Sequence, residues 1–300
     1  MRLCSPFGVR PLPQNVRVAS GNITTEAPLE PAQLDLFDSH VARFAKVEEA
    51  LHQGRLDVAG DLARQVGERF DLAEAQGLAV EIERLAVYLS GLEGDLERMA
   101  VFAERPDAQL ESLRLDGALR TAVLRGLHRR VAQAAERQGR AIVLGRPVGW
   151  HWLCAEESDR AKAALEEAVR QKRALGVSLS ILGNLALREK AVVAARELYR
   201  RAFCEDPHGV PAETIADAEV QALFDEAQEL ALDPPQEWVP MVGYAAGFFQ
   251  LPAEPQGQGG CREFHAGLLD ARRSADVAHR RRMKQLAPRL FKRLLDEHKL

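Results

Sequence analysis

The sequence predicts an all-α fold built from antiparallel pairs of helices. Apolar residues recur at steps of three and four along much of the chain, the periodicity of helices that bury one face. No segment alternates apolar and polar residues as a half-buried strand does. In the middle of the chain, small and apolar residues also recur at a spacing of 34, the length of a helix-turn-helix repeat. These patterns predict helical hairpins that bury their faces against one another.

The chain is expected to begin with a flexible arm, because residues 1–30 contain four prolines, many small polar residues and no sustained periodicity. Residues 31–139 then predict helical hairpins that act as degenerate repeats. An apolar stripe, formed by Leu34, Phe37, Val41, Phe44, Val47 and Leu51, predicts a helix that ends at Gly54. The helices expected after it span about 56–70, 73–92, 95–104 and 108–138.

Residues 140–234 carry the repeat signal. Pro147 predicts that the first helix of this region starts near Arg146 and is short, because proline is tolerated only at a helix start. Ser158 is a candidate N-cap for the next helix. Five pairs of residues lie 34 positions apart: Gly149 and Gly183, Ala161 and Ala195, Ala164 and Leu198, Leu165 and Tyr199, Ala168 and Ala202.

Seven residues of the stretch 176–209 form one pattern: Leu182, Gly183, Ala186, Ala195, Tyr199, Ala202 and Pro207. With these residues the stretch resembles a tetratricopeptide repeat (TPR). It departs from that family at Ala186, where a bulkier residue is usual, and the stretch 142–175 has Arg173 in place of the closing proline. The resemblance covers about a quarter of the chain and implies a right-handed α-solenoid that acts as a protein-binding scaffold.

The resemblance also implies a partner-binding surface on the inner face of the superhelix. Arg and Trp are frequent in binding hot spots, and Asn beside Arg suits a peptide carboxylate or backbone. The alternative for Trp150 is packing against Trp152 and the preceding helix. The residues expected to meet a partner protein or peptide are Arg146, Trp150, Leu153, Ser180, Asn184, Leu187 and Arg188.

The C-terminal part of the chain is expected to form an apolar segment and linker at 235–260, and then a basic helix at 261–300. The last forty residues carry a charge of +6, which leaves −10 on the rest. Pro288 kinks this helix or starts its last segment. One interpretation is a cap that covers the end of the solenoid, and another is binding to nucleic acid or an anionic membrane surface. The candidate anion-binding residues are Arg280, Arg281, Arg282, Lys284, Arg289, Lys292 and Arg293.

The pentapeptide from Gln33 to Phe37 resembles the peptide by which many bacterial proteins dock on the DNA polymerase sliding clamp. Gln33 and the apolar residues Leu34, Leu36 and Phe37 would fill the pockets of the clamp. With the basic helix, this peptide gives an alternative function, a DNA-maintenance accessory protein. Core packing is the competing interpretation, because Leu34 and Phe37 also belong to the apolar stripe.

No pattern in the sequence indicates catalysis. Phosphate-binding glycine loops and the G-x-S-x-G nucleophile motif are both missing, so we expect no catalytic residues and no cofactor. The histidines are scattered, which argues against a metal site. With neither a long apolar stretch nor a secretory signal, the expected location is the cytoplasm. The four cysteines have no paired spacing and are expected to be free thiols: Cys4, Cys154, Cys204 and Cys261.

Overall fold

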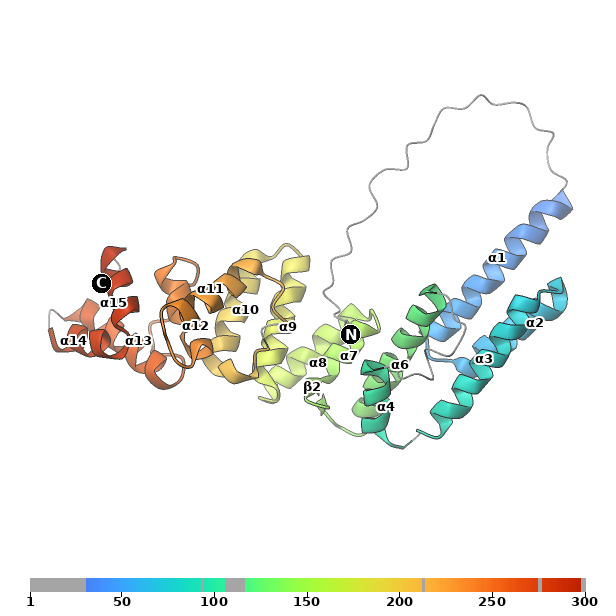
Figure 1. Ribbon diagram of the computed structural model, residues 1–300, viewed down its shortest axis with the longest axis horizontal. Coiled ribbons are helices and arrows are strands. Elements are labelled where there is room, and N and C mark those ends of the chain that lie inside the picture. Colours follow the sequence, from blue (N-terminus) through green and yellow to red (C-terminus); the bar gives the residue numbers. More distant parts are fainter. Residues whose placement is uncertain (1–30, 93, 106–116, 212–213, 275–276, 298–300) are drawn as a thin grey trace, which may run out of the picture. The chain divides into compact units, whose positions relative to one another are not determined.

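The computed structural model consists of helices joined by turns, with two strands of two residues each among the described residues (Figure 1). It describes residues 31–92, 94–105, 117–211, 214–274 and 277–297, and the side chains within these ranges from residue 42 onward. The protein is therefore all-α, as the sequence predicts. The arm expected at residues 1–30 lies outside the described residues.

The chain divides into two compact units. The N-terminal unit comprises Met1–Leu144 and His151–Glu157, and the C-terminal unit comprises Gly145–Trp150 and Ser158–Leu300. Helix α7 (Val148–Cys154) has residues in both units. The other elements of the N-terminal unit are α1 (Pro31–His52), α2 (Leu56–Phe70), α3 (Ala73–Ser90), α4 (Leu96–Glu104), α6 (Gly117–Arg137) and β1 (Ile142–Val143). Those of the C-terminal unit are β2 (Arg146–Pro147), α8 (Ser158–Arg170), α9 (Leu175–Arg188), α10 (Val192–Glu205), the 3-10 helix η1 (Pro207–Gly209), α11 (Ala218–Glu229), α12 (Pro235–Ala245), α13 (Gly259–Arg273), α14 (Val277–Leu286) and α15 (Pro288–Asp296).

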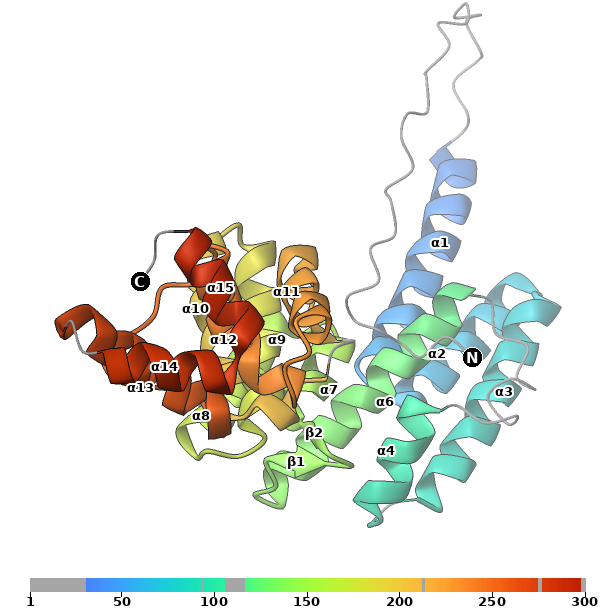
Figure 2. The same cartoon turned by 60° about the vertical axis from the view of Figure 1, so that its left-hand side comes forward.

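Helices α2 and α3 pack side by side in the N-terminal unit, as Figure 2 shows, while α1 packs against α2 and α6, and α4 against α6. Each helix buries residues at steps of three and four. Val47 and Leu51 of α1 are fully buried, so this end of the expected apolar stripe faces the core. The buried residues of α2 are Leu56, Ala59, Gly60, Ala63, Val66 and Gly67, and those of α3 are Ala75, Leu78, Ala79, Ile82, Leu85 and Leu89.

The end of α1 lies unusually close to α6. A Cβ atom added at Gly126 would lie 2.2 Å from the Leu51 carbonyl oxygen, closer than any side chain can approach. On the other side of this contact, Gly54 has a φ of +70°, and its Cβ would lie 3.0 Å from the Gly126 carbonyl oxygen. Glycine at both positions lets the turn after α1 rest directly on the backbone of α6.

Two histidines pair inside the N-terminal unit. His128 and His151 are both buried, with their Nδ1 atoms 3.1 Å apart. One ring can donate and the other accept across this distance while both are neutral. Burial, which disfavours the charged ring, lowers the pKa of His128 from 6.5 to about 4. Protonation of His128 is therefore linked to unfolding.

The 34-residue period appears in the C-terminal unit as a repeated contact. A Cβ atom at Gly149 would lie 2.4 Å from Cγ of Leu165, and one at Gly183 would lie 2.9 Å from the Tyr199 ring. The two glycines and the two side chains that press on them are each 34 residues apart. Helices α7 and α8 thus meet at a glycine, as α9 and α10 do. Four small residues of the same register are buried at these contacts: Ala161, Ala168, Ala195 and Ala202.

The second helix pair is closed by the segment that follows α10. The Asp206 carboxylate accepts the backbone N–H of Gly176 at 2.8 Å, and that of Gly209 at 3.1 Å. It therefore binds one backbone N–H in the first turn of α9, as a capping side chain does. Pro207 begins η1 directly after α10, which agrees with the proline expected to end this pair.

The rest of the chain packs into the same core as the second helix pair. A single buried cluster joins Tyr199 and Phe203 of α10 to residues of every helix from α11 to α15. The loop expected as a linker is bonded to α10, since Arg200 Nη1 donates to Gln256 Oε1 at 2.7 Å and Gln258 Nε2 to the Glu205 carbonyl at 3.2 Å. The C-terminal helices contribute Met283, Leu290, Phe291 and Leu294 to the cluster.

Most helix bounds follow the expectation. Helices α2, α3 and α4 match the expected ranges closely, α8 begins at Ser158 and α15 begins at Pro288. The helix expected to start near Arg146 begins two residues later, because a residue before proline is restricted to extended backbone, and Arg146 lies in β2. Residues 106–116, where another helix was expected to begin, lie outside the described part. None of the described helices is long and apolar enough to cross a membrane.

Replacing Gly126 by alanine is expected to destabilise the N-terminal unit by about 1 to 3 kcal/mol, since the new Cβ displaces α1 from α6. The control is Gly77→Ala in α3, where a Cβ meets nothing within 4 Å. This control should leave stability unchanged or raise it, because alanine favours a helix more than glycine does. Urea unfolding of both variants measures the difference, and equal stabilities would contradict the close contact.

Lowering the pH from 7 to 5 is expected to reduce the stability of the N-terminal unit through His128. Because burial lowers its pKa from 6.5 to about 4, the unfolded chain binds more protons in this range. The contribution is complete above pH 6.5, is lost as the pH falls toward 4, and amounts to about 3 kcal/mol at most. Urea unfolding at pH 5, 6 and 7 should show a smaller pH dependence in His128→Gln, whose side chain does not titrate. Parallel curves for the two proteins would count against a neutral buried His128.

Candidate functional site

The expected inner face of α9 is covered by the chain itself. Ser180 and Asn184 are fully buried, and the Ser180 hydroxyl lies 3.2 Å from that of Thr214. The Asn184 amide nitrogen donates to the Thr214 carbonyl, and its oxygen accepts the Ala216 backbone N–H at 2.9 Å. The Tyr199 hydroxyl also donates to Asn184, and burial raises the pKa of this tyrosine. Both residues therefore hold the segment after η1 against α9, and partner binding through them stays a prediction.

The other residues expected on the inner face differ in exposure. Trp150 and Leu153 are each 6% exposed, and the Arg146 guanidinium lies 5.2 Å from the Trp150 ring centre. This distance allows a cation–π contact. Leu187 is half-buried, while Arg188 is exposed at the end of α9. Arg146 and Leu187 are thus partly exposed and Arg188 is exposed, and contact with a partner through these three residues stays a prediction.

An open groove lies along a different face of α9, between α8 and α10. It encloses about 360 Å³ and is lined by residues of these three helices and of the turn between α9 and α10. Its lining is apolar over most of its length, through Val169, Leu179, Leu182, Leu185, Ala186, Ala194 and Leu198. We call this site the α8–α10 groove.

Charged residues of both signs border the α8–α10 groove. Lys162 and Glu166 come from α8, Glu189 from the turn and Arg201 from α10. The Lys162 ammonium lies 3.5 Å from the Glu189 carboxylate, an exposed pair that contributes little to stability. An apolar channel with such a border suits a peptide that inserts apolar side chains and places charges at the edge.

Exposed valines follow the turn that borders the groove. Val192 is 42% exposed and Val193 is 85% exposed, and both lie at the start of α10 just before the groove residue Ala194. The sequence alone does not reveal this site, because Leu179, Leu182 and Leu185 have the spacing of ordinary core residues. The available signal was Ala191-Val192-Val193-Ala194, four small or apolar residues at a helix start.

The two candidate segments of the alternative function are placed as follows. Gln33–Phe37 lies in the first turns of α1, and the side chains of this stretch fall outside the described residues. In the basic segment, Arg282 pairs with Glu263 at 2.8 Å, Arg289 donates to the Glu229 carbonyl at 2.9 Å, and Arg293 pairs with Glu226. The exposed remainder is Arg280, Arg281, Lys284 and Lys292. The apolar side of these helices is buried, as expected of a cap, and binding to an anionic partner stays a prediction.

The cysteines are free where the structure describes them. Cys204 and Cys261 are buried and Cys154 is half-buried, whereas Cys4 lies outside the described residues. Burial raises the pKa of Cys204 to about 11, so its thiol is protonated and unreactive at neutral pH. Within the described ranges, no three His, Cys, Asp or Glu side chains gather as a metal site would require.

Comparisons with protein families, with curated proteins and with solved structures found no match for this chain.

Replacing Asn184 by alanine is expected to destabilise the C-terminal unit by about 1 to 3 kcal/mol, because buried hydrogen-bonding groups on Tyr199 and the 214–216 segment lose their partner. Arg188→Ala is the matched control from the same helix, and its exposed position predicts a change within about 0.5 kcal/mol. Urea unfolding compares the two. A small effect of Asn184→Ala would mean that Asn184 is available to a partner after all.

Proposed function

We propose that this protein is a non-catalytic scaffold of TPR-like helix pairs that binds a partner protein in the α8–α10 groove. The single observation that carries the proposal is the apolar groove itself, open on the surface of the repeat region. Paired helices with close glycine contacts form a rigid frame, and such frames recognise partners by shape and a few anchor residues.

The dimensions of the groove indicate how a partner would bind. A volume of about 360 Å³ accommodates a few side chains rather than a whole folded domain. Burying one leucine-sized side chain contributes about 1.5 to 3 kcal/mol, so two or three anchors together give binding in the micromolar range after ordering costs. The occupant best suited to this site is an amphipathic helix that presents apolar residues at spacings of three and four.

The border of the groove adds a requirement on charge. Because Lys162 and Arg201 stand with Glu166 and Glu189 around the apolar lining, a partner segment with both acidic and basic flanks is favoured over a strongly charged one. Charges at an exposed rim set orientation and association rate more than affinity. The exposed Val192 and Val193 extend the apolar surface at the start of α10.

The proposal includes the right-handed superhelix that the TPR resemblance implies. Its support is the close glycine contact of α7 with α8 that recurs between α9 and α10, at glycines 34 residues apart. The sliding-clamp alternative has weaker support. Three of the seven basic side chains named for it bind acceptors within the C-terminal unit, and the apolar side of their helices is buried.

Ala194→Arg tests the groove, because a long charged side chain at this exposed lining position blocks the channel without entering the core. Tagged protein and variant are used to recover partners from lysate of the source organism, with quantification by mass spectrometry. We expect at least one protein to be recovered about tenfold less with Ala194→Arg, the loss that one blocked anchor predicts.

Ala163→Arg provides the matched control. It introduces the same side chain at an exposed alanine of α8 that does not line the groove, so it should recover partners as the parent does. Circular dichroism of both variants verifies the helix content. If every recovered protein is equally abundant with the parent and with Ala194→Arg, the groove is not a docking site.

A further inference from the structure

The charged residues that border the α8–α10 groove differ in whether they already have a partner. The Lys162 ammonium pairs with Glu189 at 3.5 Å. The Arg201 guanidinium pairs with Glu205, one turn later in α10, at 2.8 Å. Glu166 lines the groove and is exposed, but its carboxylate forms neither an ion pair nor a hydrogen bond within the part of the chain that the structure describes. Among the described residues, the border therefore carries one uncompensated negative charge.

Glu166 lies midway along the α8 wall of the groove. Lys162 lies one helical turn before it and Val169 one turn after it, and both also line the groove. Helices α8 and α10 run in the same direction, because each packs on α9 and is joined to it by a short turn. The pairing of Lys162 with Glu189, in the turn before α10, agrees with this direction. Glu166 is therefore on a level with the middle of the groove rather than with either end.

The surfaces that face this level of the groove are apolar. The residues of α9 that line it, which include Leu182 and Leu185, carry no charge. On the α10 wall, Ala194 and Leu198 precede Arg201, the lining residue nearest the end of that helix. An occupant of the middle of the groove therefore meets apolar surface on two sides and a single carboxylate on the third.

This arrangement discriminates among apolar segments by their charge. A segment that fills the groove displaces water from around Glu166, and a carboxylate that loses water without gaining a partner raises the free energy of the complex. An acidic residue at the same place adds repulsion between like charges. A lysine or arginine replaces the lost water with an ion pair, while its aliphatic stem covers apolar surface. The groove thus favours a basic residue through the cost that it imposes on the other charges.

We propose that the segment bound in the α8–α10 groove is an amphipathic helix of a partner protein, with a lysine or arginine at one edge of its apolar face that pairs with Glu166. The apolar face contacts α9 and α10, and the basic residue lies on the side of α8. This inference rests on the proposed function, because it names the chemistry of the partner for the same groove. It makes Glu166 the residue that determines specificity.

Selection from a displayed peptide library tests the proposal. The library consists of amphipathic helices about 15 residues long, the length at which an isolated helix begins to form. Each member has leucines at spacings of three and four, and the two edges of this apolar face are varied among Lys, Arg, Glu, Gln and Ala. Peptides that bind Ala194→Arg are removed first, and the remainder are selected on the full chain. We expect Lys or Arg to be enriched at one edge and not at the other.

Fluorescence anisotropy then gives the affinity of an enriched peptide for the protein and its variants. Glu166→Gln should weaken binding about two- to fivefold, the effect of losing one exposed ion pair. Glu166→Lys should weaken it further, because like charges repel, and should bind the same peptide more tightly when its basic edge residue is replaced by Glu. Raising the salt concentration should reduce the difference between the parent and Glu166→Gln.

Glu167→Gln serves as the comparison, since it makes the same change at the next position of α8. The Glu167 carboxylate pairs with Arg170 and does not line the groove. This variant should therefore retain the parent affinity within about twofold. Circular dichroism of each variant verifies that the helix content is unchanged.

Failure of this inference differs from failure of the proposed function. If no peptide is enriched on the parent relative to Ala194→Arg, the groove does not bind helices, and both proposals are overturned. If peptides are enriched without a preference for Lys or Arg, or if Glu166→Gln and Glu167→Gln weaken binding equally, the groove still binds helices but Glu166 does not determine specificity. A dimer of the full chain in analytical ultracentrifugation that Ala194→Arg dissociates would assign the groove to a second copy of the protein.

Discussion

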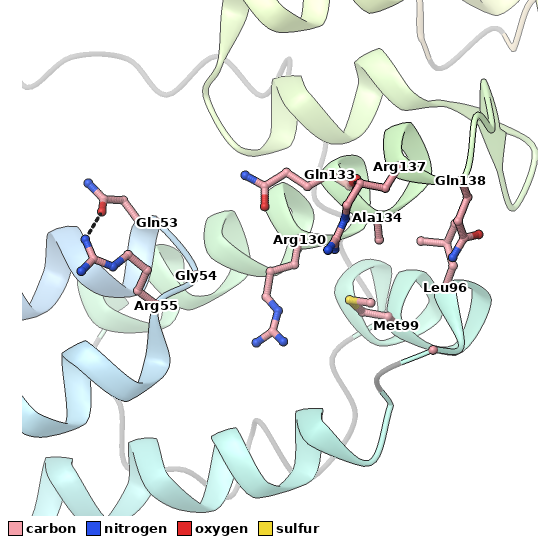
Figure 3. Close-up of a pocket in the computed structure, with 11 residues that line it drawn as sticks. Gln53, Gly54, Arg55, Leu96, Met99, Arg130, Gln133, Ala134, Arg137 and Gln138 are labelled. Atoms are coloured by element: carbon pink, nitrogen blue, oxygen red, sulfur yellow. Dashed lines mark hydrogen bonds between the residues drawn. The ribbon is translucent and has the colours of Figure 1, made fainter.

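The close approach of helices at glycine is the constraint on which the rest of this structure depends. At Gly126, Gly149 and Gly183 the neighbouring helix lies where a side chain would otherwise stand. The contact at Gly126 places the turn after α1 against α6. Arg55 of this turn and Arg130 of α6 line one pocket in the N-terminal unit (Figure 3). The contact at Gly183 sets the distance between α9 and α10, which form two of the three walls of the α8–α10 groove. Both the pocket and the groove are therefore consequences of backbone packing rather than of mobile loops.

The parts of the fold that could be predicted are those whose physical cause is local or periodic. The 34-residue register could be recognised because a close contact between two helices leaves no room for a side chain. Each repeat therefore has a glycine at this contact, Gly149 or Gly183, and a large side chain on the facing helix. The helix start at Pro288 could be predicted because a backbone N–H in the first turn has no partner within the helix. Proline, which lacks this N–H, is therefore tolerated there. By contrast, the way each helix pair packs on the next depends on contacts between residues far apart in the sequence. The apolar periodicity therefore did not predict the division into two units.

The candidate sites were hidden for a different reason. The TPR resemblance implies that the face of α9 carrying Asn184 is open to a partner. In this structure residues 214–216 cover that face and form hydrogen bonds with Asn184. A polar residue on a repeat helix has the same pattern whether it meets a ligand or its own chain. The lining of the α8–α10 groove, such as Leu182, resembles core for the same reason. Arg55 and Arg130 are 75 positions apart, and only the packing of α1 on α6 brings them to one pocket.

The covered C-terminal end strengthens the case that the α8–α10 groove has an occupant. A helical stack needs a cap because its last repeat otherwise leaves an apolar face in water. In this chain α12 to α15 pack into one core with α10, and Leu290 and Leu294 of α15 are fully buried in it, as a cap would require. The apolar lining between α8 and α10 stays open although the end of the stack is closed. The exposure of Ala194 and Val193 lies away from this buried core, and it is consistent with the partner proposed for the groove.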